Sequence, residues 1–266
     1  MFKYFTENGI SRPVHDDILA FKKSLENKGR KPSTIALYLA ATRRFFSWTE
    51  QRGIYQNIAV GVKAPRQDKG HKKDFFSATQ LKGILSGMSH NTLQNKRDYA
   101  IMAVLSACGL RTIEINRANV ADMRVMAGEP LLFVQGKGRK EKTEFVKLPE
   151  PVYHAISDYL SARGHVGDTE PLFASIGNRN HGGRMATRTI SMIAKTTMRH
   201  AGYDSARLTA HSLRHTAVTL SLMAGNSLSE TQAFARHSNI NTTEIYSHVV
   251  DRLASKCESS IANMIF

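Results

Sequence analysis

Two arginines and a histidine in this sequence have the types and spacings needed to bind a phosphate group. His211 and Arg214 are three residues apart, so on a helix the imidazole and the guanidinium share one face and can converge on one ligand. Arg111 follows a glycine turn, and a carboxylate, Glu114, comes three residues later. A guanidinium is always charged and can donate to two phosphate oxygens at once. Phosphate chemistry is therefore the first function to consider.

Three further residues could take part in such chemistry: a lysine, a second histidine and a tyrosine. Lys137 lies between two glycines in a predicted turn, and Tyr246 follows His237 by nine residues. Taken singly, each feature has an ordinary structural explanation. Gly-Lys-Gly is common in turns, an arginine with a glutamate at i+3 is a common helical ion pair, and a tyrosine in a polar stretch is usually buried in a core or an interface. The order of these residues along the chain must therefore decide between the explanations.

A metal site is the main chemical alternative. His211 and His215 are four residues apart, which on a helix brings two imidazoles to one face. The sequence has no HExxH motif, and no carboxylate or cysteine completes a zinc site. The two cysteines, Cys108 and Cys257, do not form a CxxC pair. We therefore expect no metal and no other cofactor.

The composition indicates a soluble globular protein of about two domains with a polyanionic partner. The sequence has 266 residues, of which 41% are hydrophobic and 22% are charged. Lysine and arginine number 37 against 22 aspartates and glutamates, and this net charge of +15 is typical of proteins that bind nucleic acid. No stretch approaches the ~20 apolar residues of a membrane span. The N-terminus lacks the apolar core of a signal peptide. The expected location is the cytoplasm, in association with the nucleoid.

The first quarter of the chain is predicted to form a separate helical domain. Residues 1–73 carry 15 basic against 6 acidic side chains, so they are more basic per residue than the rest. Apolar side chains recur at helical spacing up to Gly29, and a second amphipathic helix is expected to begin at Pro32 and end at Gly53. A polar segment with proline and glycine follows. This gives three predicted segments, which are a helical DNA-binding domain at 1–64, a linker at 65–74 and a larger domain at 75–266.

The larger segment is predicted to be mostly helical with one small sheet. Capping boxes that begin at Ser77 and at Ser227 mark two helix N-termini. Two β-rich runs, at 131–135 and 143–148, flank the Gly-Lys-Gly turn and predict a hairpin or a small sheet. Further helices are expected at 95–107, 151–162, 187–201, 211–224 and 248–262. The predicted fold class is therefore mainly α with a small β-sheet (α+β).

The candidate residues occur in an order that resembles one enzyme family. In chain order they are Arg111 within GLRTIE, Lys137 in a β-turn, His211 and Arg214 within HSLRHTA, His237, and Tyr246. This order, together with the segments HSLRHTA and HSNINTTEIY, resembles the catalytic domain of the tyrosine recombinases, the family of phage integrases and chromosome-dimer resolvases. Residues 32–48 are similar to the helical core-binding domain of that family. The resemblance covers nearly the whole chain and implies a two-domain clamp around duplex DNA.

Two positions depart from the pattern of the family. Ala235 and Arg236 precede His237, where the family usually has Leu-Gly, and Ala118 stands where a leucine is usual. Losing the glycine would change the backbone approach to DNA or add a phosphate contact. Neither departure removes a catalytic group. The resemblance therefore implies a site-specific DNA recombinase that is catalytically active.

The resemblance also implies a role for each candidate residue. Tyr246 is the nucleophile that forms a 3′-phosphotyrosine and frees a 5′-hydroxyl. A free tyrosine has a pKa near ~10, so it needs a base or a strong positive field at pH 7. The other implied roles are charge stabilisation by Arg111 and Arg214, a hydrogen bond from His237, proton acceptance by His211, protonation of the leaving oxygen by Lys137, and orientation of basic neighbours by Glu114. The arginines and the lysine supply the charge that a metal ion gives in other enzymes.

The implied partners are double-stranded DNA and further copies of the chain. Five basic residues are candidate DNA contacts, namely Lys31, Arg43, Arg44, Arg139 and Lys140. A solvated basic surface explains the same residues equally well. The apolar tail at 251–266 is similar to the family's exchanged C-terminal helix, which implies a tetramer on two DNA sites. Docking of the tail on its own domain is the alternative, and no membrane partner is expected.

Other functions remain open on the sequence alone. A type IB-like topoisomerase or a hairpin-forming resolvase uses related chemistry, although the compact helical N-terminal segment favours recombination. A non-catalytic DNA-binding regulator could share the fold, but Tyr246 and both arginines of the pattern are present. A metal-dependent nuclease would need a carboxylate cluster that the sequence lacks. These motifs do not distinguish integration, excision, inversion and dimer resolution.

Overall fold

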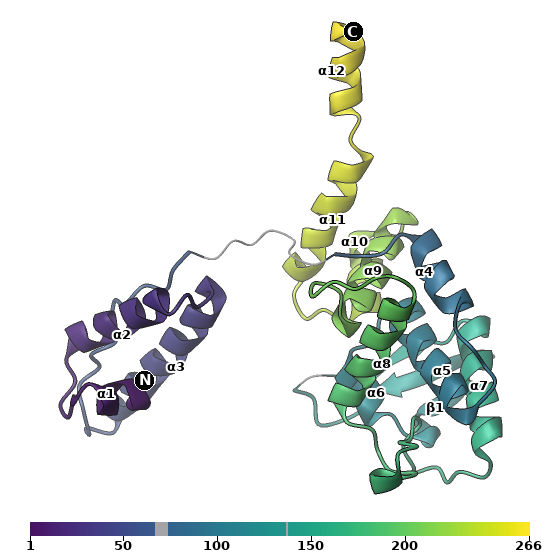
Figure 1. Cartoon of the computed structure of the whole chain (residues 1–266), viewed down its shortest axis with the longest axis horizontal. Coiled ribbons are helices and arrows are strands. Elements are labelled where there is room, and N and C mark those ends of the chain that lie inside the picture. Colours follow the sequence, from purple (N-terminus) through teal and green to yellow (C-terminus); the bar gives the residue numbers. More distant parts are fainter. Residues whose placement is uncertain (67–73, 137) are drawn as a thin grey trace. The chain divides into compact units, whose positions relative to one another are not determined.

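The computed structural model describes residues 1–66, 74–136 and 138–266 (Figure 1). Lys137 and residues 67–73 of the predicted linker lie outside the described residues. Helices dominate the described chain, and they are accompanied by one three-stranded antiparallel sheet. The predicted fold class, mainly α with a small β-sheet, is confirmed.

Backbone contacts divide the chain into two compact units, and the smaller unit is Met1–Gly70. Its described helices are α1 (Phe2–Glu7), α2 (His15–Asn27) and α3 (Pro32–Gln51). Pro32 occupies the first turn of α3, where its missing N–H costs nothing. Ile18 of α2 and Leu39 of α3 are fully buried in the core of this unit. The predicted pair of amphipathic helices is therefore present, and α1 was not predicted.

The larger unit, His71–Phe266, contains the remaining elements. Its α-helices are α4 (Ala78–Ser86), α5 (Leu93–Ala107), α6 (Thr112–Arg117), α7 (Glu150–Arg163), α8 (Thr187–His200), α9 (Ala210–Met223), α10 (Leu228–Ala235), α11 (Asn241–Ala254) and α12 (Cys257–Ile265). Its sheet has the order β1 (Met123–Met126), β2 (Glu129–Val134) and β3 (Glu144–Lys147), with both pairs antiparallel. The predicted hairpin corresponds to β2 and β3.

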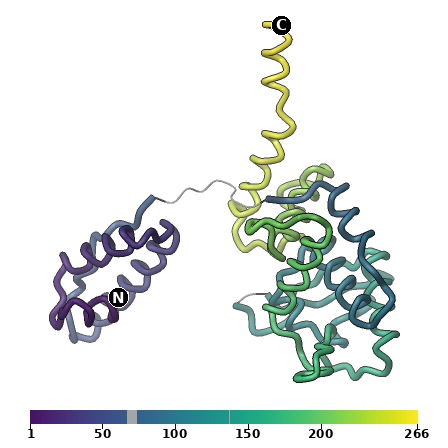
Figure 2. Tube along the Cα trace, in the orientation of Figure 1, coloured from purple at the N-terminus to yellow at the C-terminus, as the bar shows by residue number. Residues whose placement is uncertain are grey.

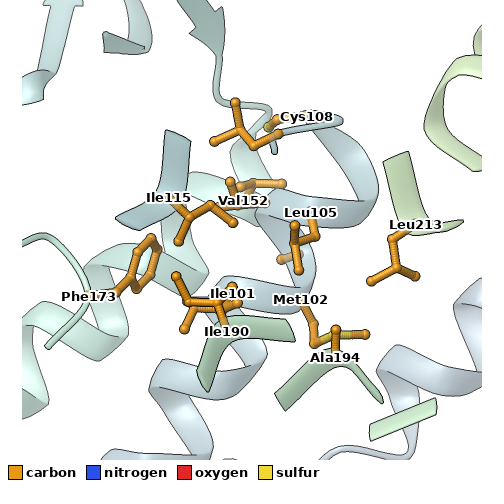
Figure 3. Close-up of a cluster of buried hydrophobic side chains, with 14 of the residues drawn as sticks. Ile101, Met102, Leu105, Cys108, Ile115, Val152, Phe173, Ile190, Ala194 and Leu213 are labelled. Atoms are coloured by element: carbon orange, nitrogen blue, oxygen red, sulfur yellow. The ribbon is translucent and has the colours of Figure 1, made fainter. Parts of the chain in front are cut away.

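The core of the larger unit surrounds α5 and fixes the helices that carry the candidate residues. Figure 3 shows side chains from several helices meeting there, among them Ile101 of α5, Ile115 of α6, Ile190 of α8 and Leu213 of α9. Each of these side chains is at most 1% exposed. Burial of such a side chain contributes about 1.5–3 kcal/mol. The same core therefore sets the positions of α6 and α9 relative to each other.

The C-terminal part of the chain differs from the prediction. One helix was expected at 248–262, but the structure has α11 and α12 in its place, because Ser255 adopts extended backbone between them. No residue of α12 is buried, and Figure 2 shows this helix extending away from the body of the larger unit. None of the described helices combines the length and the apolar character needed to cross a membrane.

Candidate active site

A tight turn places Arg111 at the start of α6. Gly109 in this turn has a φ of 56°, and a Cβ there would lie 3.2 Å from the ring of Phe234, so the position requires glycine. Arg111 is the N-cap residue of α6. The carboxylate of Glu114 accepts the backbone N–H of Arg111 at 2.8 Å and its Nη1 also at 2.8 Å. The arginine is therefore held at both its backbone and its side chain by one glutamate.

Glu114 is a fully buried carboxylate. Burial raises the pKa of this group, but the charges of Arg236 and Arg111 outweigh burial and hold the pKa below its ordinary value. Glu114 is therefore ionised at neutral pH. It gives the surrounding guanidinium groups a fixed counter-charge inside the protein.

Arg214 of α9 brings a second guanidinium to the same place. Its side chain is 2% exposed. Nη1 donates to the carbonyl of Gly109 at 2.5 Å, and Nη2 donates to the carbonyl of Ala235. Burial lowers the pKa of Arg214 to about 9, with the neighbouring charge of Arg111 as the next cause. Arg214 remains charged at pH 7 and joins the turn before α6 to the end of α10.

Tyr246 lies on α11 with its hydroxyl turned toward α9. The side chain is 5% exposed, and its Oη forms a hydrogen bond with Nδ1 of His215. Burial raises the pKa of Tyr246 to about 12, opposed by the charges of Arg214 and Arg111. The candidate nucleophile is therefore protonated and shielded from solvent, although two guanidinium groups lie close enough to act on its oxygen.

The contact between Tyr246 and His215 was not anticipated from the sequence. We expected His211 to accept the proton of the tyrosine. The structure places the imidazole of His215 on the hydroxyl, and the ring of His211 packs edge-on against that of His215 with centroids 4.4 Å apart. From the sequence, His215 is a candidate only for a metal ligand. The sequence feature that could have indicated a place for His215 at the site is its position one turn after His211, because both rings then share a face of α9.

His237 lies at the same site, directly after α10. Its ring stacks on that of Tyr246 with centroids 6.3 Å apart, and its Nδ1 lies 2.9 Å from Oγ1 of Thr243. Burial lowers the pKa of His237 to about 4, and the charges of Arg214 and Arg111 act in the same direction. The imidazole is therefore neutral at pH 7. It is suited to donate a hydrogen bond to a phosphate oxygen from a neutral ring.

Arg236 is a second residue of the site that was not assigned a role from the sequence. Its side chain is 4% exposed, and its Nη2 lies 3.0 Å from Oε2 of Glu114. The sequence indicated either a changed backbone or an added phosphate contact at this position. In the structure the guanidinium contacts Glu114, so three arginines surround one carboxylate. The departure from Leu-Gly marks Arg236 as unusual in the sequence. The sequence pattern does not contain the information that its guanidinium contacts Glu114.

The other candidate DNA contacts lie on the surface. Arg139 and Lys140 follow β2 and are exposed, and Arg139 forms an ion pair with Glu144 at 3.1 Å. A cavity of about 760 Å³ is lined by residues that include Arg111, Arg139 and His237. This loop therefore borders the candidate active site. The predicted role of the neighbouring lysine falls outside the described residues.

The basic candidates of the smaller unit belong to α3 and to the residue before it. Lys31 is the N-cap residue of α3, and Lys31, Arg43 and Arg44 are exposed. Arg43 and Arg44 line a shallow groove of about 640 Å³ together with Leu37. Their role in DNA binding stays a prediction. Across the described part of the chain, no three histidine, cysteine, aspartate or glutamate side chains are grouped so that they could hold a metal ion.

The catalytic candidates all lie within a segment that matches a known family. Residues 74–252 match the model described as the phage integrase family. The chain belongs to the phage integrase family. The resemblance to tyrosine recombinases that the sequence motifs indicated is therefore confirmed.

Relatives of this phage integrase family member carry recombinase names. Tyrosine recombinase XerC of Caldanaerobacter subterraneus subsp. tengcongensis is 31% identical over 242 residues, which cover 89% of this chain and 65% of that protein. Tyrosine recombinase XerC of Actinobacillus pleuropneumoniae serotype 7 is 32% identical over 223 residues, which cover 84% of this chain and 70% of that protein. The chain thus spans only part of the length of these relatives.

A solved structure shows the same fold. The crystal structure of the XerH site-specific recombinase bound to a palindromic difH substrate, a post-cleavage complex, superposes with a TM-score of 0.79 at 19% identity. The superposition covers 98% of this chain and 76% of that one. This likeness supports the helical fold with its small sheet.

Proposed function

We propose that this protein is a site-specific DNA recombinase of the tyrosine type, which cleaves and rejoins DNA through Tyr246. One observation carries the proposal. The hydroxyl of Tyr246 meets an imidazole, His215, at a place where the charges of Arg214 and Arg111 act on the same oxygen. A nucleophile, a base and two phosphate-binding groups are the parts that transfer of a phosphodiester requires.

The proposed step forms one bond and breaks one. Oη of Tyr246 attacks a phosphorus of the DNA backbone, and the bond from that phosphorus to the 5′-oxygen breaks. The product is a 3′-phosphotyrosine and a strand with a free 5′-hydroxyl. The phenol proton passes to Nδ1 of His215, which it already contacts, and His211 packs against that ring. Protonation of the leaving oxygen by Lys137 stays a prediction.

The guanidinium groups stabilise the charge that builds up on the phosphate. Arg111 and Arg214 would donate to its non-bridging oxygens, and His237 would donate from its neutral ring. Such preorganised donors are worth more in a buried site than in water, because the surroundings screen charge less. The proposal therefore needs no metal ion, since positively charged side chains already supply the stabilisation.

Duplex DNA is the proposed substrate. The net charge of +15 and the exposed arginines of α3 are what a DNA-binding surface requires. We propose that the smaller unit is a core-binding domain and the larger unit the catalytic domain. The enzyme class predicted from the sequence agrees with the recombinase names of the relatives, and those names favour recombination over the topoisomerase alternative.

The proposed assembly is a tetramer in which the tail of each copy docks on the next. The apolar side chains of α12 are exposed, among them Ile261, Met264 and Phe266. A groove of about 1020 Å³ on the larger unit is lined by residues of α4, α5, α9 and α10, including Leu81, Leu85 and Leu220. We expect deletion of 256–266 to leave DNA binding intact and to abolish strand exchange. Normal recombination by the truncated protein would overturn this part of the proposal.

Covalent capture of DNA tests the central proposal without knowledge of the target site. The protein is incubated in EDTA with a pool of random-sequence duplexes that each carry one nick, so that a short cleaved strand diffuses away and the adduct accumulates. Adducts that survive SDS are recovered and sequenced. We expect the wild-type protein to enrich a defined sequence, held through its 3′ end, and the Tyr246→Phe variant to capture none.

Three outcomes would contradict the proposal. The first is the absence of an adduct with the wild-type protein, and the second is a requirement for Mg²⁺. The third is cleavage that persists in Tyr246→Phe. The Tyr246→Phe protein should still bind the enriched duplex, because only the hydroxyl is removed, and this binding is the control for folding.

A further inference from the structure

Arg236 adopts a backbone conformation that disfavours an arginine. It follows α10 with φ of 53° and ψ of 47°, which is the left-handed region. Among the described residues, Ala127 is the one other non-glycine residue with a positive φ. A Cβ crowds the following carbonyl in this region, so glycine is the residue that fits without strain. Strain of this kind persists where the surroundings impose it, often at functional sites.

The side chain of Arg236 turns back into the protein rather than outward. Nη2 lies 3.0 Å from Oε2 of Glu114, and Nη1 donates to the carbonyl of Phe234 at 2.7 Å. Its Nε is buried and has no hydrogen-bond partner among the residues that the structure describes. A buried donor without a partner costs stability. Both the backbone and the side chain of this residue are thus held in a costly arrangement.

The same residue touches the other parts of the active site. Its carbonyl accepts Nη2 of Arg111 at 3.4 Å, and the next residue is His237. Nη1 of Arg111 donates to Oε1 of Glu114, whereas Nη2 of Arg236 donates to Oε2. Arg236 therefore links α6, which begins after Arg111, to the segment that carries His237.

We infer that Arg236 is a positioning residue of the active site, which holds Glu114, Arg111 and His237 in the arrangement that the attack of Tyr246 on a phosphodiester requires. This inference rests on the proposed function. Arg236 acts through Glu114 and Arg111 rather than on the DNA, because its guanidinium is 4% exposed and already committed to a carboxylate.

The charges of the cluster support a role in phosphate chemistry. Three guanidinium groups, those of Arg111, Arg214 and Arg236, surround the single carboxylate of Glu114, so the cluster carries an excess of positive charge. Burial lowers the pKa of Arg214, and the charges of Arg111 and Arg236 add to this effect. A phosphate that enters the site relieves this repulsion. Arg236 thus prepares the site for an anion without contacting it.

Replacement of Arg236 by glycine separates a role in catalysis from a role in folding. Arg236→Gly removes the guanidinium and relieves the backbone strain, and Arg111 still pairs with Glu114 so that the carboxylate keeps a counter-charge. We therefore expect its thermal midpoint to equal or exceed that of the wild-type protein. We expect the single-turnover rate of cleavage to fall roughly 10- to 100-fold, the size of effect seen when a residue that orients the ligands of a metal site is lost. Affinity for the duplex should change less than threefold.

Two further variants complete the experiment. Arg236→Lys keeps the charge but not the two-pronged donor, and we expect it to recover part of the lost cleavage rate. Ala127→Gly relieves strain at the other left-handed position, which is in the turn between β1 and β2, and it should cleave at the wild-type rate. The probe throughout is the duplex enriched by covalent capture with the wild-type protein.

Each outcome supports the inference or overturns it. A slow and stable Arg236→Gly protein with unchanged DNA affinity supports it. Cleavage within twofold of wild type overturns it, as does a parallel fall of thermal midpoint and rate, which would indicate a role in folding. A fall in DNA affinity that accounts for the whole loss would make Arg236 a DNA contact instead. Failure of the proposed function is distinguishable, because the wild-type protein would then form no adduct.

Discussion

Replacement of Glu114 by glutamine keeps the shape of the buried side chain and removes its charge. The carboxylate accepts the backbone N–H and Nη1 of Arg111, both at 2.8 Å, and Nη2 of Arg236 at 3.0 Å. A glutamine offers these three donors only one carbonyl oxygen. Its N–H₂ group faces the donor that this oxygen does not accept. Glu114→Gln therefore leaves three guanidinium groups together with no counter-charge.

The expected loss of stability follows from these contacts. At an effective dielectric constant of ~20, two charges ~4 Å apart interact by about 4 kcal/mol. Glu114 has two such partners, but burying the carboxylate itself costs several kcal/mol, which offsets part of the gain. Breaking a buried ion pair by removing one member typically costs about 3–5 kcal/mol. We therefore expect Glu114→Gln to lower the free energy of unfolding by about 3–5 kcal/mol.

Two optical signals separate the units in the assay. The one tryptophan, Trp48, lies on α3 in the smaller unit, whereas Glu114 lies in the larger unit. Urea unfolding of the full chain followed by circular dichroism reports on helices of both units. Fluorescence reports on the smaller one. We expect Glu114→Gln to lower the urea midpoint seen by circular dichroism and to leave the fluorescence midpoint of Trp48 unchanged.

A matched variant and a double variant complete this experiment. Glu144→Gln breaks the ion pair with Arg139, whose side chain is 55% exposed, and should cost less than about 1 kcal/mol. Adding Arg236→Gly to Glu114→Gln removes one uncompensated charge, so the double variant should be more stable than Glu114→Gln alone. A loss below about 1 kcal/mol for Glu114→Gln, or no recovery in the double variant, would refute the account of the cluster.

Three further outcomes follow from the site and its surroundings. Because the pKa of His237 falls from 6.5 to about 4 on folding, its neutral form stabilises the protein above pH 6.5, and this contribution is lost as the pH falls toward 4. After a discount for partial exposure, this contribution to the free energy of unfolding is about 1–2 kcal/mol. The free energy of unfolding of His237→Gln, measured with urea, should therefore depend less on pH between 6.5 and 4 than that of the wild-type protein. Thiol titration should detect Cys257 at once and Cys108 only after unfolding, since burial raises the pKa of Cys108 to about 12. His215→Gln should slow formation of the Tyr246 adduct by roughly 10²-fold or more while DNA binding persists; an unchanged rate would exclude His215 as the base.

Much of the fold could be predicted because local sequence signals agree with the tertiary structure. In the predicted capping boxes, Ser77 accepts the N–H of Gln80, and Ser227 accepts the N–H of Glu230. The weaker elements escaped prediction for a physical reason. Strand β1 has only four residues, mostly exposed, so it lacks the apolar alternation that marks a strand. The helix expected at 248–262 was wrong, because the apolar residues there belong to two helices separated at Ser255.

The site could be predicted where its residues are neighbours in sequence and could not where they meet through the fold. Arg111 and Glu114 are three residues apart, and the structure pairs them at 2.8 Å. By contrast, His211 and His215 share a face of one helix. The packing of α11 on α9 brings His215 to the hydroxyl of Tyr246, 31 residues away in the sequence. Such a contact depends on distances between helices, which the sequence pattern does not contain.

The two hydrogen bonds of Arg214 to backbone carbonyls have a consequence for how this protein can change over generations. Because Arg214 joins the carbonyls of Gly109 and Ala235, its loss would damage the fold as well as the chemistry. The hydroxyl of Tyr246 forms its hydrogen bond with a side chain, that of His215, and a phenylalanine fills nearly the same space. A gene copy released from selection for activity would therefore lose its tyrosine while keeping its arginine. Among descendants of this sequence, retention of Arg214 would reveal little about activity, whereas retention of Tyr246 would be informative.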